Sequence, residues 1–338
     1  MLTSKKLSMF TVILTCSLSV FGPSAMAVTV PAGSVDQLAA AIAEAGPGGQ
    51  VVLEAGVHKE SGTVLVDTTV SIVGQDGAVL EAATTPGSAI PVAVEPALHI
   101  KAAGARVSNL SIRAPKGATA NCAILIEDAP DVEISDNTIT DHQLGILIQN
   151  GHRAQIQGNR IRIVSTPDSG LPENGIVVIN GDYVTIRDNW VSHAFVGIFL
   201  SGSQGDASGN TTTESFLGVI FCNPTELYAI SGQPAVAHTA ATGWIVYQNA
   251  SFANSWGYIV IDGANNNTLV NNSAALNAMY DIELAGDSMR FGFLTPASYD
   301  NMVVQGLDYQ GLKVKDCGTN NEVRGHVNLV DTSEDTCF

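Results

Sequence analysis

The chain has few charged residues, and most of them are acidic. Only 14% of its 338 residues are charged, with 15 basic residues against 32 acidic ones, and aromatic residues make up 6%. This charge balance repels nucleic acid and anionic lipid, so neither is expected as a partner. After Phe21 no apolar run approaches the ~18–20 residues that a membrane-spanning helix needs. No low-complexity linker divides the chain, so a single elongated domain is expected.

The first 27 residues have the pattern of an export signal. Lys5-Lys6 precede an apolar run over residues 7–21, and Ala25-Met26-Ala27 supplies a small-x-small cleavage site. A lipoprotein anchor on Cys16 is the alternative, although the residue before it fits that motif poorly. Cleavage after Ala27 would leave a secreted or periplasmic domain, residues 28–338, with 13 basic and 32 acidic residues and a net charge of −19.

A short apolar phrase recurs between residues 123 and 221. Its openings are Ala123-Ile-Leu-Ile, Gly145-Ile-Leu-Ile, Gly175-Ile-Val-Val, Gly197-Ile-Phe-Leu and Gly218-Val-Ile-Phe. After the first four openings an Asn follows at an interval of 14, 14, 14 and 13 residues. Self-similarity at this period is typical of a solenoid, in which stacked repeats share one core. Short strands and Gly/Asn turns without a helical period favour a parallel β-helix.

This pattern resembles the right-handed parallel β-helix repeat of pectate-lyase-like proteins. The resemblance includes a ladder of asparagines at one turn, formed by Asn137, Asn159, Asn189, Asn210, Asn249 and Asn272. It implies an all-β solenoid of about nine to ten coils, with the recurring aliphatic pairs inside. The match covers nearly all of the mature chain and is specific for the fold, but not for an activity.

The two ends of the solenoid need protection. Ser34-Val-Asp-Gln37 has the form of a capping box, and we expect a capping helix over about residues 34–45. A tail is expected over about residues 327–338. Cys122 and Cys222 lie four repeats, or about 19 Å, apart and cannot pair, since a disulfide allows about 7 Å between Cα atoms. Cys317 and Cys337 flank the last coil, and we expect them to form a disulfide; four free thiols are the alternative.

Three stretches break the repeat, near residues 164–172, 223–243 and 286–300. All three leave the solenoid beside the first strand of the repeat, so we expect them to flank the outer face of those strands. Most outward positions there are apolar, so loops or a partner chain should cover the middle of the face. The outward positions that could contact a substrate are Gln149, Phe199, Asp262 and Glu283.

A second group of polar residues lies at the turn before this face. Three of them follow a ladder Asn by four residues: Asp141, His193 and Glu214. Arg162 occupies the adjacent position on the coil between Asp141 and His193, and Arg113 lies on the coil before Asp141. His142 follows Asp141 directly. Arg can bind a uronate carboxylate in two places, and His can move a proton near neutral pH. Such a row could abstract the C5 proton of a uronate, as lyases and epimerases do, with Asp141, His142, His193 and Glu214 as the catalytic candidates.

Several observations argue against a simple transfer of catalytic roles. Turn rows of solenoids are polar because they face water, and Asp, His and Arg side chains there are usually just solvated, so a plain solvated surface is the first explanation of these residues. The sequence lacks the Asp-Pro-His element of alginate epimerases and the Gly-His-Gly and Arg-x-Lys elements of polygalacturonases. Calcium is the one cofactor with candidate ligands, at Glu127, Asp128, Asp131, Glu133 and Asp136, but plain surface acidity explains this cluster as well. We assign no metal site.

Two functions therefore remain open. The first is an exported protein that binds or modifies an acidic polysaccharide, with lyase-like or C5-epimerase-like chemistry if it is an enzyme. The second is a non-catalytic envelope module whose apolar face binds a partner protein. Periplasmic copper-handling β-helix proteins are of this second type, but six methionines supply few soft copper ligands. The expected partner is accordingly a polysaccharide or an envelope protein.

Overall fold

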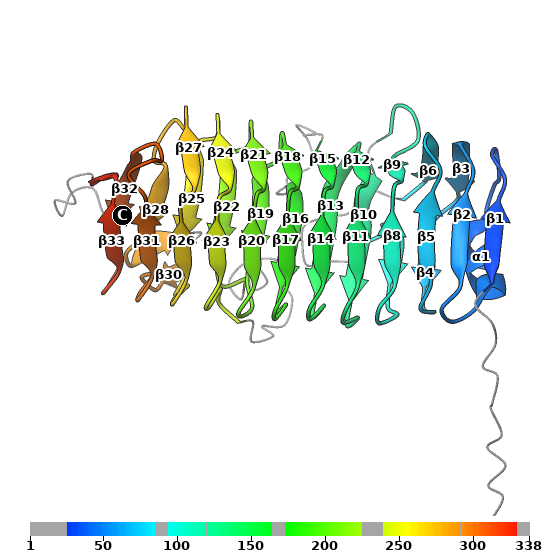
Figure 1. The fold of residues 1–338 in the computed structure, drawn as a ribbon, viewed down its shortest axis with the longest axis horizontal. Coiled ribbons are helices and arrows are strands. Elements are labelled where there is room, and N and C mark those ends of the chain that lie inside the picture. Colours follow the sequence, from blue (N-terminus) through cyan, green and yellow to red (C-terminus); the bar gives the residue numbers. More distant parts are fainter. Residues whose placement is uncertain are drawn as a thin grey trace, which may run out of the picture.

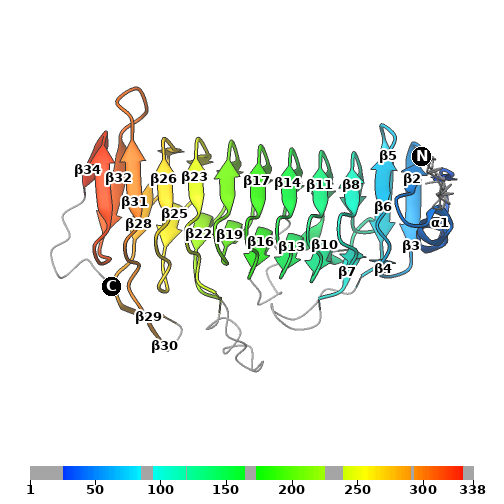
Figure 2. The same cartoon turned by 60° about the horizontal axis from the view of Figure 1, so that its bottom comes forward.

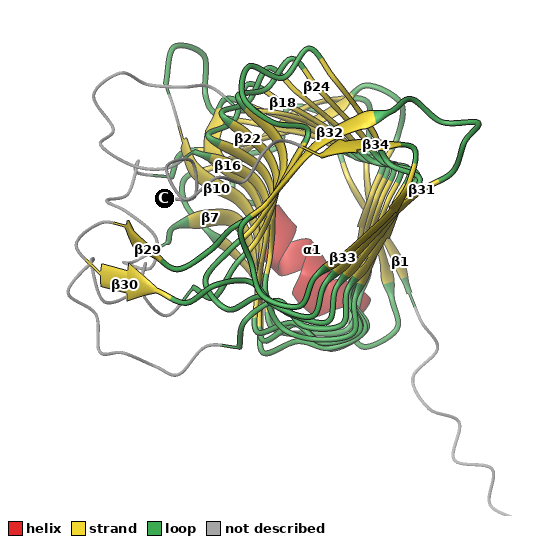
Figure 3. Ribbon diagram, turned by 90° about the vertical axis from the view of Figure 1, so that its left-hand side faces the viewer, coloured by secondary structure: helices red, strands yellow, loops and turns green. Residues whose placement is uncertain are grey.

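Three long parallel sheets wind around one axis (Figures 1 and 3). The computed structural model describes residues 26–84, 94–118, 120–163, 173–224, 239–290 and 293–329. In these residues the sheets contain 12, 11 and 9 strands, and successive strands of the chain pass from one sheet to the next. The protein is a right-handed parallel β-helix, as the sequence predicted.

We name the sheets A, B and C. Sheet A contains β1 (Ala27–Val30), β2 (Gln50–Leu53), β5 (Ser71–Gly74), β8 (Arg106–Ser108), β11 (Glu133–Ser135), β14 (Gln155–Gln157), β17 (Thr185–Arg187), β20 (Asp206–Ser208), β23 (Ile245–Tyr247), β26 (Thr268–Val270), β31 (Met302–Gln305) and β33 (Glu322–Gly325). Sheet B contains β3 (Gly56–Glu60), β6 (Ala78–Ala82), β9 (Ser111–Arg113), β12 (Thr138–Thr140), β15 (Arg160–Arg162), β18 (Trp190–Ser192), β21 (Thr211–Thr213), β24 (Ala250–Phe252) and β27 (Ser273–Ala275).

Sheet C corresponds to the first strand of the repeat. It contains β4 (Val64–Val66), β7 (Pro96–Ile100), β10 (Ala120–Glu127), β13 (His142–Gln149), β16 (Asn174–Ile179), β19 (Val196–Leu200), β22 (Leu217–Phe221), β25 (Trp256–Val260), β28 (Ile282–Leu284), β32 (Leu312–Asp316) and β34 (Val327–Leu329). The strand β34 thus adds to sheet C within the stretch expected to be a tail, and residues 330–338 lie outside the described residues.

The recurring aliphatic pairs fill the interior. Ile146 is paired in register with Ile124 on one side and Ile176 on the other, and all three are fully buried. Ile198 continues the same row on the next coil. Burial of each such side chain contributes about 1.5–3 kcal/mol, so the stacked rows account for much of the stability. The inward orientation expected from the alternation is confirmed.

The asparagine ladder is also confirmed. In each of its steps from Asn137 to Asn272, a backbone N–H of one Asn donates to the side-chain oxygen of the Asn one coil later, at 2.9–3.0 Å. The side-chain amides also donate to buried backbone carbonyls, such as that of Ile134 from Asn159. The ladder thereby satisfies backbone groups that the turn would leave unpaired inside the protein.

The capping helix is shorter than predicted. The helix α1 (Leu38–Ala45) covers the N-terminal end of the stack (Figures 1 and 2). The expected capping box does not form, because the Ser34 hydroxyl contacts Nδ1 of His58 at 2.9 Å. Instead, the backbone N–H of Leu38 donates to Glu60 Oε1 on the following coil, at 3.0 Å. A carboxylate from the sheet thus replaces the local cap.

The middle of the outer face of sheet C is buried within this single chain. Fourteen apolar side chains in the middle of this face are each at most 9% exposed, whereas Leu65 at its N-terminal end is 45% exposed and Trp256 is half-buried. The fourteen are Cys122, Leu125, Leu144, Leu147, Val177, Ile179, Val196, Phe199, Leu217, Ile220, Cys222, Ile259, Ile261 and Ala285. Of the three excursions, residues 164–172 and 225–238 lie outside the described residues, and the third contains the hairpin of β29 (Ser288–Arg290) and β30 (Phe293–Thr295) (Figure 3). A covered apolar face was expected, and no partner chain is needed to cover it.

Some expectations concern the ends of the chain. Residues 1–25, which include most of the expected export signal, lie outside the described residues. So does Cys337, and the Cys317–Cys337 disulfide stays a prediction. Cys122 and Cys222 are buried and form no disulfide with each other, in agreement with the distance argument. Within the described ranges, no helix combines the length and the apolar character that crossing a bilayer requires.

Candidate functional site

The corner between sheets B and C carries the polar turn row. We call Asp141, His193 and Glu214 the corner row; each follows a sheet B strand directly and has a left-handed backbone, with φ between 52° and 61°. Ala253 and Leu276 adopt the same conformation at the equivalent positions, so the geometry belongs to the turn and not to a catalytic site. The strand register places Arg162 on the coil between Asp141 and His193, as the spacing predicted.

His193 and Glu214 form the one direct pair of the corner row. His193 Nε2 lies 2.8 Å from Glu214 Oε2, and their side chains are 42% and 58% exposed. The two residues lie on neighbouring coils, so their side chains meet across a single strand spacing of about 4.8 Å. An imidazole held by a carboxylate in contact with water can bind a ligand or exchange a proton.

Asp141 stands apart from this pair. Two strand spacings, or about 9–10 Å, separate its backbone from that of His193. Its Oδ2 accepts a hydrogen bond from the Thr140 hydroxyl at 3.1 Å. In the described part of the chain, no ion pair links Asp141 to Arg162 or His193. The predicted row is therefore aligned, but its acid, its base and its arginine do not converge.

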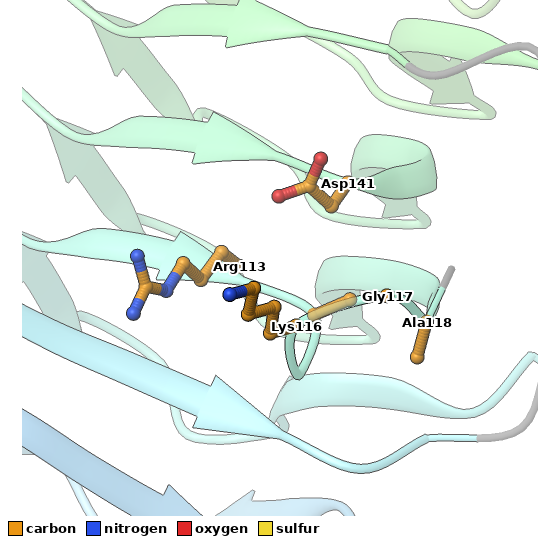
Figure 4. A pocket seen from close by; sticks show the side chains of 6 residues that line it. Arg113, Lys116, Gly117, Ala118 and Asp141 are labelled. Atoms are coloured by element: carbon orange, nitrogen blue, oxygen red, sulfur yellow. The ribbon is translucent and has the colours of Figure 1, made fainter.

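Arg113 and Asp141 line a pocket of about 420 Å³, together with Ala114, Lys116, Gly117 and Ala118 (Figure 4). Arg113 and Lys116 come from one coil, and Asp141 comes from the next (Figure 4). The Arg113 guanidinium is already engaged by Glu81, whose Oε1 lies 2.7 Å from Nη2 and 2.9 Å from Nε. Lys116 is exposed, so it is the cation of this pocket that a ligand could use.

His142 belongs to the interior of the turn. It is fully buried, and its Nδ1 lies 2.7 Å from the carbonyl of Thr140. Because a carbonyl only accepts, Nδ1 carries the proton in the neutral ring. Burial lowers the pKa of His142 to about 4, so the ring is neutral at pH 7. This placement separates His142 from the exposed corner row.

We expect His142 to make stability pH-dependent. An unfolded histidine titrates near 6.5, so between pH 6.5 and 4 the unfolded chain binds more protons and the free energy of unfolding falls as the pH falls. Between pH 7 and 5 the loss should be about 2 kcal/mol. Urea unfolding at both pH values measures it. His142→Gln should flatten the profile, whereas His326→Gln at an exposed position should not; an unchanged profile in His142→Gln would contradict the assignment.

The remaining candidates lie on sheet C or, for Asp262, two residues after the end of β25, and they do not join the corner row. Phe199 and Glu283 are 4% and 5% exposed, and Asp262 is 8% exposed. Gln149 is half-buried at the far end of β13, seven residues from the turn. Glu283 accepts a hydrogen bond from Trp256 Nε1 at 2.7 Å and lies 3.6 Å from Lys315 Nζ. A substrate role for these four residues stays a prediction.

Sequence reasoning missed two groups of residues near the corner. Arg160 places its guanidinium carbon 3.7 Å from the centroid of the Trp190 ring, on the outer face of sheet B. Phe195 and Phe216 stack at 5.0 Å beside the corner row, and Phe216 meets Trp256 edge-on at 5.3 Å. Strand alternation was the available signal for Arg160, since residues two apart share a face and Arg162 was already a candidate.

The acidic cluster considered for calcium is divided among other partners. Glu127 contacts His99 and Lys101, Asp131 contacts Arg153, Glu133 contacts Arg106, and Asp128 accepts from Asn150. Lys101 and His99 lower the pKa of Glu127, with the Lys101 hydrogen bond as the main cause. Over the described ranges, no group of three His, Cys, Asp or Glu side chains is arranged to hold a metal ion.

Comparison with known proteins agrees with this architecture. Residues 60–221 match the family model described as "Right handed beta helix region". A search of curated protein sequences gives no significant match. By its fold, and by this match over residues 60–221, the chain is a right-handed parallel β-helix protein.

Three solved structures illustrate the likeness. The endo-xylogalacturonan hydrolase of Aspergillus tubingensis is 12% identical with a TM-score of 0.57, covering 90% of this chain and 95% of the other. The Family 28 exopolygalacturonase of Yersinia enterocolitica is 12% identical with a TM-score of 0.56, covering 89% and 71%. The A-module of the mannuronan C-5 epimerase AlgE6 of Azotobacter vinelandii is 12% identical with a TM-score of 0.51, covering 88% and 93%. At such identities the likeness concerns the fold alone.

Proposed function

We propose that the protein is an exported β-helix that binds an acidic polysaccharide along the corner between sheets B and C. The observation that carries the proposal is the exposed His193–Glu214 pair on the two coils that follow Arg162, an exposed arginine with no carboxylate within 4 Å in the described residues. A guanidinium of this kind can bind a uronate carboxylate through two parallel hydrogen bonds. His193 would then face the sugar that the arginine holds.

The geometry favours binding over catalysis. Abstraction of a C5 proton needs a base and a group that stabilises the developing charge within hydrogen-bond reach of one sugar. Asp141 lies two coils from His193, and His142 is fully buried. The His193–Glu214 pair is the remaining acid–base candidate, and a lyase or epimerase would have to rely on it.

The envelope-module alternative loses its main support. That interpretation has the apolar face of sheet C bind a partner protein, and the chain itself already buries the middle of that face, so a partner would have to bind elsewhere on the molecule. The export signal expected in residues 1–27 and the polysaccharide-acting enzymes among the structural neighbours support a secreted or periplasmic glycan-directed role. A polysaccharide is accordingly the partner we propose.

A panel of polygalacturonate, alginate and neutral dextran tests the proposal by calorimetry. We expect binding to at least one polyuronate, no binding to dextran, and affinity weakened about 10-fold by Arg162→Ala, because a charge-assisted contact is lost. His193→Ala should weaken binding more than His152→Ala does. His152 is the matched control, because it is 43% exposed and lies 3.3 Å from Asp182 at a different turn.

The same samples distinguish binding from turnover. Absorbance reports unsaturated chain ends, and NMR reports proton exchange at C5. We expect neither signal to change. Turnover that His193→Ala abolishes would replace the binding role with a catalytic one, and a wild-type protein that binds no polyuronate would end the proposal.

A further inference from the structure

The basic residues of this acidic protein are distributed unevenly. Seven of the basic side chains in the described residues form ion pairs with carboxylates: Lys101, Arg106, Arg113, Arg153, Arg187, Lys315 and Arg324. Five others have no carboxylate within 4 Å in the described residues, and four of these lie on or beside sheet B: Lys59 at its N-terminal end, and Lys116, Arg160 and Arg162 nearer its middle. The unneutralised positive charge of the described surface therefore gathers on one face.

Trp190 holds Arg160 in place. The two residues are partners in register on β15 and β18, with the guanidinium carbon 3.7 Å from the ring centroid. Stacking on an aromatic ring occupies the face of the guanidinium and leaves its in-plane N–H donors available. An arginine ordered in this way loses less conformational entropy when it binds an anion.

The surroundings of this pair suit an anion. The sheet B strip, defined as Thr138, Arg160, Arg162, Trp190 and Thr211, follows the register from β12 to β21. It offers two guanidinium groups, two hydroxyls and one indole ring that is 37% exposed. Asp136, Asp141 and Asp188 lie at the edges of the strip, and none of them is within 4 Å of either guanidinium in the described residues.

We propose that the sheet B strip is where the acid groups of the polysaccharide bind, and that the polymer extends from the corner row across the outer face of sheet B. This inference rests on the proposed function and assigns the carbohydrate surface to sheet B, away from the buried outer face of sheet C. Charge complementarity supports it, because an acidic polymer is repelled elsewhere by a chain of net charge −17. The carboxylates of the corner row would face the hydroxyl edge of the sugars.

Calorimetry with polygalacturonate and alginate tests the strip. Arg160→Ala should weaken binding about 10-fold, because it removes a charge-assisted contact. Trp190→Ala keeps every charge but releases Arg160, and should weaken binding about 5-fold. The matched control is Arg187→Ala, which removes an equal charge from the outer face of sheet A, where Arg187 is paired with Asp206 at 3.2 Å. The control should change affinity less than about 2-fold, in line with exposed ion pairs.

The outcomes separate this inference from the function on which it rests. If Arg160→Ala and Trp190→Ala both match Arg187→Ala while Arg162→Ala still weakens binding, the strip is wrong and the corner site stands. If all three arginine variants lose affinity equally, the effect is global charge and the strip is again overturned. A wild-type protein that binds neither polymer overturns both proposals. Wild-type-like melting curves confirm that the variants are folded.

Discussion

Asn159→Ala should lower the free energy of unfolding by about 4 kcal/mol. Asn159 is 1% exposed, and its side-chain oxygen accepts from the backbone N–H of Asn137 while its amide donates to the carbonyl of Ile134. Alanine would leave both backbone groups buried and unpaired, at about 1–3 kcal/mol each, and would also break the ladder contact to Asn189. Urea unfolding at neutral pH measures the loss.

Two comparison variants sharpen this test. Asn159→Asp keeps the accepting oxygen but loses the donor, so it places oxygen against the oxygen of Asn189 and should be destabilising as well. Asn150→Ala is the control, because Asn150 is only half-buried and its side chain bonds to the exposed Asp128. An Asn159→Ala protein as stable as the Asn150→Ala control would show that the ladder does not hold the turns.

The ladder and the core could be predicted from the sequence because both depend on a period. The spacing from Gly145 to Asn159 equals that from Gly175 to Asn189, so equivalent residues lie at the same angle around the solenoid axis. The register of the sheet C strands can therefore be predicted from the spacing alone. The start of α1 could not be read in this way. Its first free N–H is satisfied by Glu60, 22 residues later and one coil away.

The ion pairs of the site were also harder to predict, because they too join side chains on neighbouring coils. Arg113 and Arg162 occupy the same row of sheet B, yet Glu81 engages only Arg113. Glu81 lies 32 residues before Arg113, whereas Glu214 lies 21 residues after His193. The two separations differ because the coils differ in length. Sequence spacing gives the row on which a residue lies, but the partner on a neighbouring coil depends on side-chain reach. Which cations remain free is therefore a property of the folded stack.

The outer faces of sheets C and B show how side-chain burial affects the prediction of a binding surface. The sequence indicated that the apolar outer face of sheet C would be covered, and the burial of Leu125, Phe199 and Ile220 agrees. It also placed substrate contacts on that face, at Phe199 and Glu283, because the excursions leave beside it. Covering the face removes these side chains from solvent, so the polar binding candidates that stay exposed are those of the corner row and of sheet B.

Glu283→Ala should destabilise the protein by about 4 kcal/mol while leaving polysaccharide binding unchanged. Glu283 and Lys315 pair at 3.6 Å with side chains that are each 7% exposed, and Trp256 Nε1 donates to the same carboxylate. Removing one partner leaves the Lys315 ammonium buried without its counter-charge, which typically costs about 3–5 kcal/mol. Tyr280, whose ring centroid lies 5.1 Å from Lys315 Nζ, replaces little of that interaction.

The double variant Glu283→Met with Lys315→Met distinguishes a charge effect from a packing effect. Both charges are then gone, and apolar side chains of similar length fill the space, so most of the lost stability should return; about 1–3 kcal/mol stays lost because Trp256 Nε1 no longer has its acceptor. Asp131→Ala is the matched control, because it breaks the exposed pair with Arg153 and should change stability far less. If Glu283→Ala weakened polysaccharide binding without affecting stability, Glu283 would be a substrate contact after all, and sheet C would have to open for the polymer to reach it.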